Sequence, residues 1–475
     1  MVMAGANRAA LAITAFAMIL LGAAPVWGQE ERADAFLRDQ AVRQHIPGLS
    51  VAVVQTGAVV FARSYGLANI ENSVPATADT VYLLGSVTKT FAATAIMLLA
   101  EEGRIELDDP FVNYMKDLSL PKQVEQITVR QLLSHTSGIT DFTDIPDSIQ
   151  FARKDRMPRD VVHDALALPL LFKPGEQFRY SNSNYILLGM IIERIVGKRF
   201  SAFLEHRIFQ PLHMTSTMMQ NLRAIVPKRA SGYNWIDGKW LNADYVSPAN
   251  LYAAGGAIST ILDLVKWDEA LFSGKLVKPA TLSKMLSAAL LANGERTHYG
   301  LGLELLNDRG HPLAGHAGEA FGFNATLYHY LDDHLTVIVL ANQGDAPTEF
   351  LAKSAAAIYL GLPEISYRNR NPIPDPEPRF AAILKRVIQS AAKGMVEESL
   401  FTVSARGELA PLIARAGPEL LAPKGKLNAI ELLERAQEGQ ALVLVFRARF
   451  ANDNLIWTMR VAKDGNIAGL EPQPE

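Results

Sequence analysis

The sequence predicts an α+β fold in which an antiparallel sheet is flanked by helices and joined to a helical region. Two β-rich runs, residues 49–55 and 58–65, surround a Thr-Gly turn and are typical of a hairpin. Two later runs, residues 325–330 and 335–340, predict a second hairpin that returns to the same sheet. A Pro-rich stretch after residue 370 separates this unit from a second, smaller α+β unit.

The first 28 residues are predicted to be a secretory signal peptide. Arg8 precedes an apolar run over residues 9–24, and a small residue, Gly28, comes directly before a polar stretch. This order is typical of an export signal, so we expect cleavage after Gly28 and a periplasmic or secreted mature protein. An uncleaved membrane anchor is the alternative, although the run is short for a spanning helix.

Helices are predicted where apolar residues follow one another without an internal break by Pro or Gly. A glycine closes two of these segments, at Gly103 and Gly197. The glycine-bearing segment 253–260 is expected to be a turn, and a strand is expected to start near Tyr299. The predicted helices cover residues 33–44, 91–100, 186–196, 261–272 and 348–360.

Three units follow the signal peptide in the predicted domain organisation. They are a large domain over residues 29–365, an extended linker over 366–379 and a small α+β domain over 380–475. The small domain is expected to contain a helix and two strands, over residues 380–401, 441–450 and 455–461. It carries no evident catalytic set, and we interpret Arg447 and Arg449 as solvated positions on a strand.

Composition excludes several classes of function. The 475 residues carry a formal net charge of −3, which gives no indication of a nucleic-acid partner. Because cysteine is absent, disulfides, thiol nucleophiles and cysteine-bound metals are excluded. His311 and His316 are too isolated to predict a metal site, so we expect neither a metal nor another cofactor. No Gly-x-Ser-x-Gly motif is present, which disfavours an α/β-hydrolase.

A serine and a lysine begin the apolar helix that contains residues 91–100. Ser86 and Lys89 are spaced i, i+3, which puts both side chains on one face and within reach of each other. A serine hydroxyl needs a base to become a good nucleophile, and a lysine can be that base only if its pKa is lowered. The alternative interpretation is a Ser cap beside a solvated lysine.

Two later segments carry further candidate residues. Tyr180 and Asn182 are expected on a loop ahead of a buried helix, where catalytic groups are common. A core tyrosine and a helix N-cap are the respective alternatives. His316 precedes Gly318 in a glycine-rich segment, and a histidine satisfied within a turn is its alternative.

Three motifs in this order resemble the penicillin-binding-protein and class C β-lactamase superfamily of serine hydrolases. The resemblance covers residues 46–362 and is strongest to the branch with family VIII esterases and D-specific peptidases. It implies a β-lactamase/DD-peptidase-like fold and hydrolysis through an acyl-enzyme. The motifs are Ser86-Val87-Thr88-Lys89, Tyr180-Ser181-Asn182 and His316-Ala317-Gly318.

The resemblance also implies roles for single residues. Ser86 would attack a carbonyl group while Lys89 and Tyr180 together handle its proton, with either as the base. The backbone N–H groups of Ser86 and Glu319 would form the oxyanion hole, with the Glu319 side chain facing solvent. Three further motif residues would contact the substrate, and one of them, Asn182, could instead hold the Lys89 ammonium. These substrate-binding residues are Asn182, His316 and Gly318.

A histidine, His316, stands where true β-lactamases of this superfamily have lysine. With an ordinary pKa of about 6.5, it would titrate between about pH 5.5 and 7.5 and bind a substrate carboxylate weakly. We therefore expect an ester or D-residue peptide substrate rather than a β-lactam, with peptidoglycan fragments as further candidates. The alternatives are a class C-like β-lactamase and a penicillin-binding or cell-wall-binding protein that deacylates slowly.

Overall fold

The computed structural model describes residues 26–475 except 146–152, 364–366, 368–369 and 439–440. The apolar run of the expected signal peptide lies outside the described residues. The described chain begins with α1 (Val26–Arg43), which starts earlier than the predicted helix and includes Gly28, where cleavage is expected. Within the described part of the chain, no helix has the length and apolarity that crossing a membrane requires.

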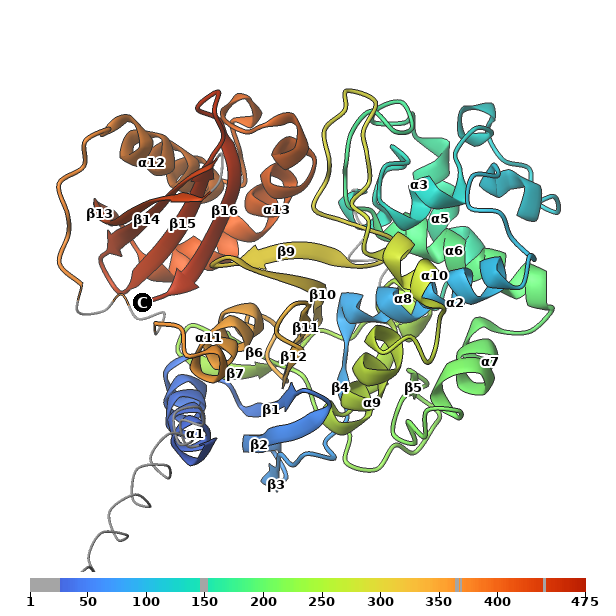
Figure 1. The fold of residues 1–475 in the computed structure, drawn as a ribbon, viewed down its shortest axis with the longest axis horizontal. Helices are drawn as coiled ribbons and strands as arrows, with labels where there is room; N and C mark the ends of the chain where they lie inside the picture. The colour runs from blue at the N-terminus through green and yellow to red at the C-terminus, as the bar shows by residue number, and fades with distance from the viewer. Residues whose placement is uncertain (1–25, 146–152, 364–366, 368–369, 439–440) are drawn as a thin grey trace, which may run out of the picture.

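A seven-stranded antiparallel sheet forms the centre of the large domain, in the order β3-β2-β1-β12-β11-β10-β9 (Figure 1). Both expected hairpins are present, and β1 pairs with β12, for example Val51 with Val339. The first and last strands therefore meet in one sheet, which confirms the predicted α+β class. The strands are β1 (Gly48–Gln55), β2 (Ala58–Asn69), β3 (Val74–Pro75), β9 (Glu304–Asp308), β10 (His311–Ala320), β11 (Phe323–Tyr330) and β12 (Leu335–Ala341).

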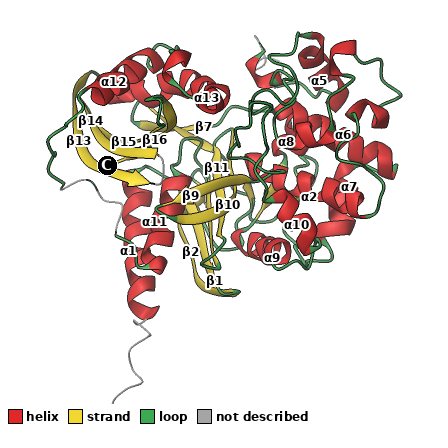
Figure 2. Ribbon diagram, turned by 45° about the horizontal axis from the view of Figure 1, so that its top comes forward, coloured by secondary structure: helices red, strands yellow, loops and turns green. Residues whose placement is uncertain are grey.

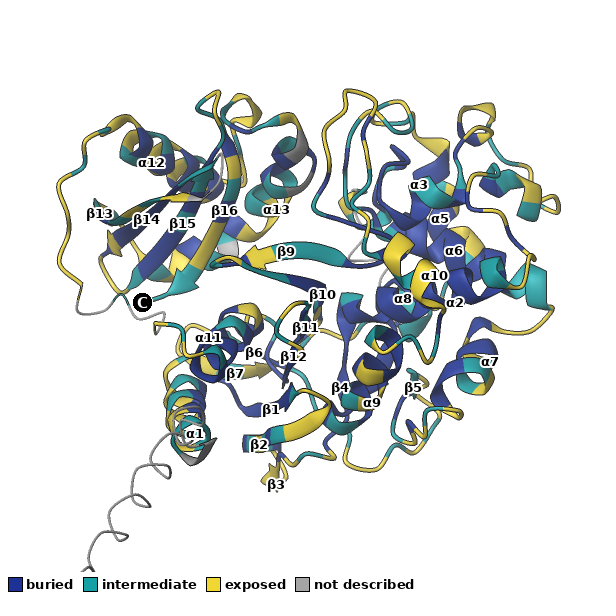
Figure 3. Cartoon of the chain, in the orientation of Figure 1, coloured by how far each residue is buried: buried dark blue, intermediate teal, exposed yellow. Residues whose placement is uncertain are grey.

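Helices cover both faces of this sheet (Figure 2). On one face α1 and α11 (Thr348–Leu360) pack on β1 and β12, with Leu37 and Leu351 fully buried. On the other face lies a helical layer around α2 (Thr88–Glu101), whose residues are dark blue in Figure 3 because almost all are buried. Phe91 of α2 packs its ring against Trp267, with ring centroids 4.5 Å apart.

The helical layer is built from short and medium helices joined by small strands. Its other helices are α3 (Val129–Leu133), α5 (Pro158–Ala167), α6 (Asn182–Val196), α7 (Phe200–Leu204), α8 (Pro248–Gly255), α9 (Ile261–Phe272) and α10 (Pro279–Met285). Its strands are β4 (Tyr82–Leu83), β5 (Met218–Met219) and β8 (Ala257–Ser259). A separate hairpin of β6 (Tyr233–Ile236) and β7 (Lys239–Asn242) lies beside the chain that follows β12, where Tyr233 bridges to Gln343. Short turns of helix are η1 (Gly85–Val87), η2 (Phe111–Tyr114), η3 (Lys122–Val124), η4 (Phe142–Asp144) and η5 (Glu205–Phe209).

Three local predictions in the large domain are wrong at their boundaries. Ser86 lies in the 3-10 turn η1 just before α2, because Gly85 takes φ +51° against the backbone of Glu319. Asn182 is the first residue of α6 rather than a loop residue. The segment 253–260 holds the end of α8 and the strand β8, because β8 finds partners in β4 and β5.

The C-terminal module is a four-stranded antiparallel sheet with two helices on it (Figure 1). The predicted helix 380–401 ends at Ala391, since Gly394 takes φ +68° soon after it. Arg447 is buried rather than solvated, and it pairs with Glu431 and Glu475. The elements are α12 (Arg379–Ala391), η6 (Glu398–Leu400), α13 (Val403–Leu421), η7 (Ala422–Lys424), β13 (Leu427–Glu438), β14 (Ala441–Phe450), β15 (Asn454–Val461) and β16 (Ile467–Pro474).

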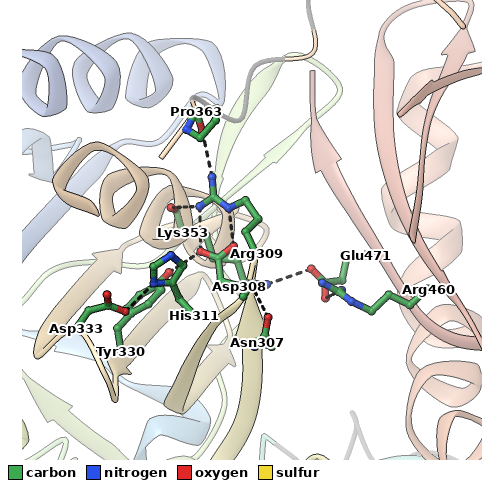
Figure 4. Close-up of polar contacts among 11 residues, drawn as sticks. Asn307, Asp308, Arg309, His311, Tyr330, Asp333, Lys353, Pro363, Arg460 and Glu471 are labelled. Carbon is green, nitrogen blue, oxygen red and sulfur yellow. Dashed lines mark hydrogen bonds and ion pairs between the residues drawn. The ribbon is translucent and has the colours of Figure 1, made fainter. Parts of the chain in front are cut away.

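Among the described residues, an ion pair and a close backbone contact join the module to the large domain. Lys353 of α11 forms an ion pair with Glu471 of β16, with 3.0 Å between nitrogen and oxygen (Figure 4). Gly407 of α13 lies directly on the backbone of Phe178, where a Cβ atom would come within 1.6 Å of the Phe178 carbonyl oxygen. Only a glycine permits this approach, so α13 packs against the chain two residues before Tyr180.

Candidate active site

Ser86 and Lys89 are brought together by the start of α2. Ser86 is half-buried, whereas Lys89 is fully buried, and the Lys89 Nζ lies 2.9 Å from the Ser86 Oγ. The two side chains therefore meet as the i, i+3 spacing predicts. A hydroxyl that is open to a substrate thus sits beside an amine that is shielded from water.

Lys89 contacts neutral oxygens. Besides Ser86, its Nζ lies 2.8 Å from Asn182 Oδ1 and 2.6 Å from the carbonyl oxygen of Ala254. Burial lowers the pKa of Lys89 to about 7, and the negative charges of Asp141 and Glu304 act in the opposite direction. Lys89 is consequently able to lose its proton near neutral pH, and the neutral amine is the form that can accept a proton from Ser86.

Tyr180 is placed beside this pair from the loop before α6. The Lys89 Nζ lies 4.8 Å from the centre of the Tyr180 ring. The Tyr180 hydroxyl is buried, and among the described residues no group meets both the distance and the angle of a hydrogen bond with it. Burial raises its pKa well above 10, and the neighbouring Ser86 hydroxyl only partly offsets this. Tyr180 is therefore a neutral phenol in this arrangement.

His316 is buried on β10 rather than placed in a turn. Its Nε2 lies 2.8 Å from the Tyr299 hydroxyl, and its Nδ1 lies 2.5 Å from the Ala317 carbonyl oxygen and 3.5 Å from Glu304. Burial, and after it the charge of Lys89, lowers the pKa of His316 to about 3. The expectation that His316 titrates between about pH 5.5 and 7.5 is therefore wrong, because the buried ring stays neutral throughout that range.

Glycines let β10 approach the turn that carries Ser86. A Cβ atom on Gly318 would lie 2.8 Å from the Ser86 nitrogen, and one on Gly85 would lie 2.8 Å from the Glu319 nitrogen. The backbones of Ser86 and Glu319 thus run side by side, as a pair of oxyanion donors requires. The Glu319 residue itself is exposed.

Several residues around the site have no local signal in the sequence. Asp141 is buried, and its Oδ2 accepts hydrogen bonds from the backbone nitrogen of Asn182 at 3.0 Å and from its Nδ2 at 2.9 Å. Tyr299 and Glu304 also lie outside the three motifs, although both contact His316. In the described part of the chain, no cluster of His, Asp or Glu side chains is suited to a metal ion.

Comparison with known families and proteins shows what this chain is similar to. A family model described as Beta-lactamase matches residues 33–360. Protein flp of Staphylococcus aureus is 34% identical over 206 residues, which is 43% of this chain and 41% of flp. The chain thus spans less than half the length of that curated relative. Penicillin-binding protein 4* of Bacillus subtilis is 28% identical over 334 residues, 66% of this chain and 72% of that protein.

Solved structures give the same picture. The octameric penicillin-binding protein homologue from Pyrococcus abyssi has a TM-score of 0.64 at 23% identity and covers 94% of this chain and 98% of its own. D-amino acid amidase from Ochrobactrum anthropi SV3 has a TM-score of 0.62 at 26% identity, covering 70% of this chain and 99% of its own. The fold predicted from the sequence motifs is confirmed by these similarities.

Proposed function

The chain belongs to the beta-lactamase family, and on that basis we propose that it is a serine hydrolase with Ser86 as its nucleophile. The observation that carries the proposal is the 2.9 Å contact between the Ser86 Oγ and the Nζ of a buried lysine whose pKa is lowered to about 7. A serine becomes nucleophilic when an adjacent base takes its proton, and Lys89 is such a base at neutral pH.

The geometry supports a reaction in two steps. Neutral Lys89 takes the proton of Ser86 as the Oγ attacks a carbonyl carbon, and the developing oxyanion faces the backbone N–H groups of Ser86 and Glu319. Each such donor contributes about 3 kcal/mol to the transition state. Tyr180, a neutral phenol next to both groups, gives its proton to the leaving group as the scissile bond breaks, and it regains a proton from the Lys89 ammonium. Water then attacks the acyl carbonyl carbon, the bond to the Ser86 Oγ breaks, the acid product leaves, and a proton from the water returns to the Oγ.

Electrostatics favours substrates that lack a carboxylate beside the scissile bond. The third motif contributes a neutral, buried histidine instead of a cation, and the carboxyl groups that act on Lys89 are those of Asp141 and Glu304. A substrate carboxylate would meet a neutral ring at His316, and the cation that acts on this ring is the active-site Lys89 itself. We therefore propose an ester or an amide of a D-residue as the substrate, in keeping with the similarity to D-amino acid amidase.

Cell location and domain organisation belong to the same proposal. An exported enzyme would follow from the basic start and apolar run of residues 1–28. Residues 29–365 would carry the reaction, and the module after the 366–379 linker would support it.

Turnover by the purified chain tests the proposal. We expect hydrolysis of a short-chain nitrophenyl ester and of D-phenylalanine amide, slower hydrolysis of L-phenylalanine amide, and little of a chromogenic cephalosporin. Ser86→Ala should abolish turnover and labelling by a fluorophosphonate. Ser287→Ala, which changes an exposed serine at a helix end, is the matched control and should keep both.

Two outcomes would contradict this assignment. Labelling that persists in Ser86→Ala would show that Ser86 is not the nucleophile. Cephalosporin turnover faster than ester or amide turnover would instead favour the β-lactamase alternative. A burst of cephalosporin acylation without turnover would favour a penicillin-binding protein.

A further inference from the structure

We propose that Asp141 is a positioning residue of the acylation step, which orients the side-chain amide of Asn182 so that its oxygen faces Lys89. The inference rests on the proposed serine hydrolase function and assigns a role to a residue outside the three motifs. Asp141 contacts neither Ser86 nor a substrate position directly. It acts through Asn182, which links it to Lys89.

The side chain of Asp141 acts as a hydrogen-bond acceptor in each of its contacts with Thr143 and Asn182. It lies just before η4, its side chain is 4% exposed, and its Oδ1 accepts a hydrogen bond from the Thr143 nitrogen at 2.9 Å. Its Oδ2 accepts from both the backbone nitrogen and the Nδ2 of Asn182. An ionised carboxylate only accepts hydrogen bonds, so the three N–H groups that converge on Asp141 favour its charged form. Burial raises the pKa of Asp141, and the hydrogen bonds from Asn182 and Thr143 act in the opposite direction.

This arrangement sets the orientation of the Asn182 amide. Because Nδ2 donates to Asp141, the carbonyl oxygen Oδ1 is left to face Lys89, at 2.8 Å. The flipped amide would set its Oδ1 against the carboxylate and its Nδ2 against the amine, losing both hydrogen bonds. A buried amide cannot adopt that state without the cost of two unsatisfied groups.

The oriented amide in turn aims the lone pair of Lys89. A neutral amine has two N–H donors and one lone pair. The carbonyl oxygens of Asn182 and Ala254 take the two donors, at 2.8 and 2.6 Å. The lone pair is then left to accept the proton of Ser86. Asp141 thus prepares Lys89 as a base, although it touches neither reacting atom.

Asp141 also contributes charge to the site. The ionisable groups that face Lys89 are two carboxyls, two histidines and two tyrosines, on β9, β10, α6 and the loops before α6 and after α3. Burial keeps the histidines and tyrosines neutral near pH 7, since it lowers the former and raises the latter pKa values. Charge near Lys89 therefore comes from the carboxyls. The six groups are Asp141, Glu304, His135, His316, Tyr180 and Tyr185.

The isosteric variant Asp141→Asn tests this role through the pH profile of kcat/KM for the nitrophenyl ester. Loss of the negative charge should move the acid limb, which reports Lys89, to lower pH by roughly 0.5–1 unit. Loss of the amide orientation should reduce kcat on the plateau roughly tenfold, with a smaller change in KM. Asp144→Asn, which removes a carboxylate three residues away that pairs with Arg179, should change neither quantity.

A charge-exchange variant keeps the test decisive if Asp141→Asn folds poorly. Asp141→Asn combined with Asn182→Asp restores the donor and acceptor pair but moves the carboxylate next to Lys89. Its acid limb should lie at higher pH than that of the wild-type protein. An acid limb that is unchanged in both variants would overturn the role of Asp141. If the fluorophosphonate does not label Ser86 in the wild-type protein, the proposed function is overturned instead.

Discussion

Lys89 and Lys353 are both withdrawn from solvent, and their pKa values move in opposite directions. Lys89 in the active site is fully buried among neutral oxygens, and its pKa falls to about 7. Lys353 between the large domain and the C-terminal module is 16% exposed and lies 3.0 Å from Glu471. Burial also acts to lower the pKa of Lys353, but the carboxylates around it outweigh burial and raise that pKa.

The difference shows what turns a buried lysine into a base. Glu349 and Asp308 add to the charge of Glu471 beside Lys353, so its ammonium is stabilised. Figure 4 shows Lys353 facing Glu471 of the module. At Lys89 the carboxylate of Asp141 does not touch the amine, because the side chain of Asn182 lies between them. Neutral acceptors satisfy the N–H groups of Lys89 without stabilising its positive charge to the same extent.

The largest expected effect comes from replacing the active-site lysine. Lys89→Arg keeps a positive charge, but a guanidinium does not lose its proton at any working pH, so it cannot act as a base. We expect the acylation rate, measured in single turnovers with the nitrophenyl ester, to fall by roughly 10³-fold. The acid limb near pH 7 should disappear. Retention of a tenth or more of the wild-type rate would remove Lys89 from the role of base.

A stability effect without a catalytic one is expected at the other lysine. Lys353→Met should lower the free energy of unfolding by about 1 kcal/mol, measured by urea titration at pH 7, because the ion pair is partly exposed. The acid limb of kcat/KM should be unchanged. Lys198→Met, at an exposed position after α6, is the matched control and should leave both quantities unchanged.

The same pair predicts the pH dependence of that stability difference. Lys353 lowers the pKa of Glu471, so the pair contributes fully above the unfolded value of about 4.3 and its contribution is lost as pH falls through the folded pKa. The raised pKa of Lys353 preserves the contribution up to about pH 10. The gap between wild-type and Lys353→Met should therefore narrow as the pH falls from 7 to 3. A constant gap from pH 7 to pH 3 would refute this electrostatic origin.

The smallest effect is expected at His316. Because burial keeps this ring neutral, His316→Gln exchanges one neutral group for another and leaves the charge around Lys89 unchanged. The midpoint of the acid limb should stay within about 0.3 pH unit of the wild-type value. A shift of a full unit would show that His316 carries charge in the working enzyme and that Lys89 alone does not set the limb.

Secondary structure was predictable where the local pattern and the tertiary environment agree. The predicted helices 261–272 and 348–360 coincide with α9 and α11, which are apolar on their buried faces and bounded by Thr260 and Gly361. The prediction failed for α13, which continues through Pro411 and Pro418. It failed also for β8, a short strand that exists because β4 and β5 lie on either side of it.

The sequence by itself determined that Ser86 and Lys89 meet, because a spacing of three residues in a helical turn places two side chains on the same face. It also determined the two hairpins of the sheet, since both are encoded by β-rich runs around turns. Only the tertiary structure decided the chemistry of Lys89. Its three hydrogen-bond partners come from Ser86, Asn182 and Ala254, and the charge behind Asn182 comes from Asp141. A pKa depends on desolvation and on neighbours in space, and packing brings these distant segments together.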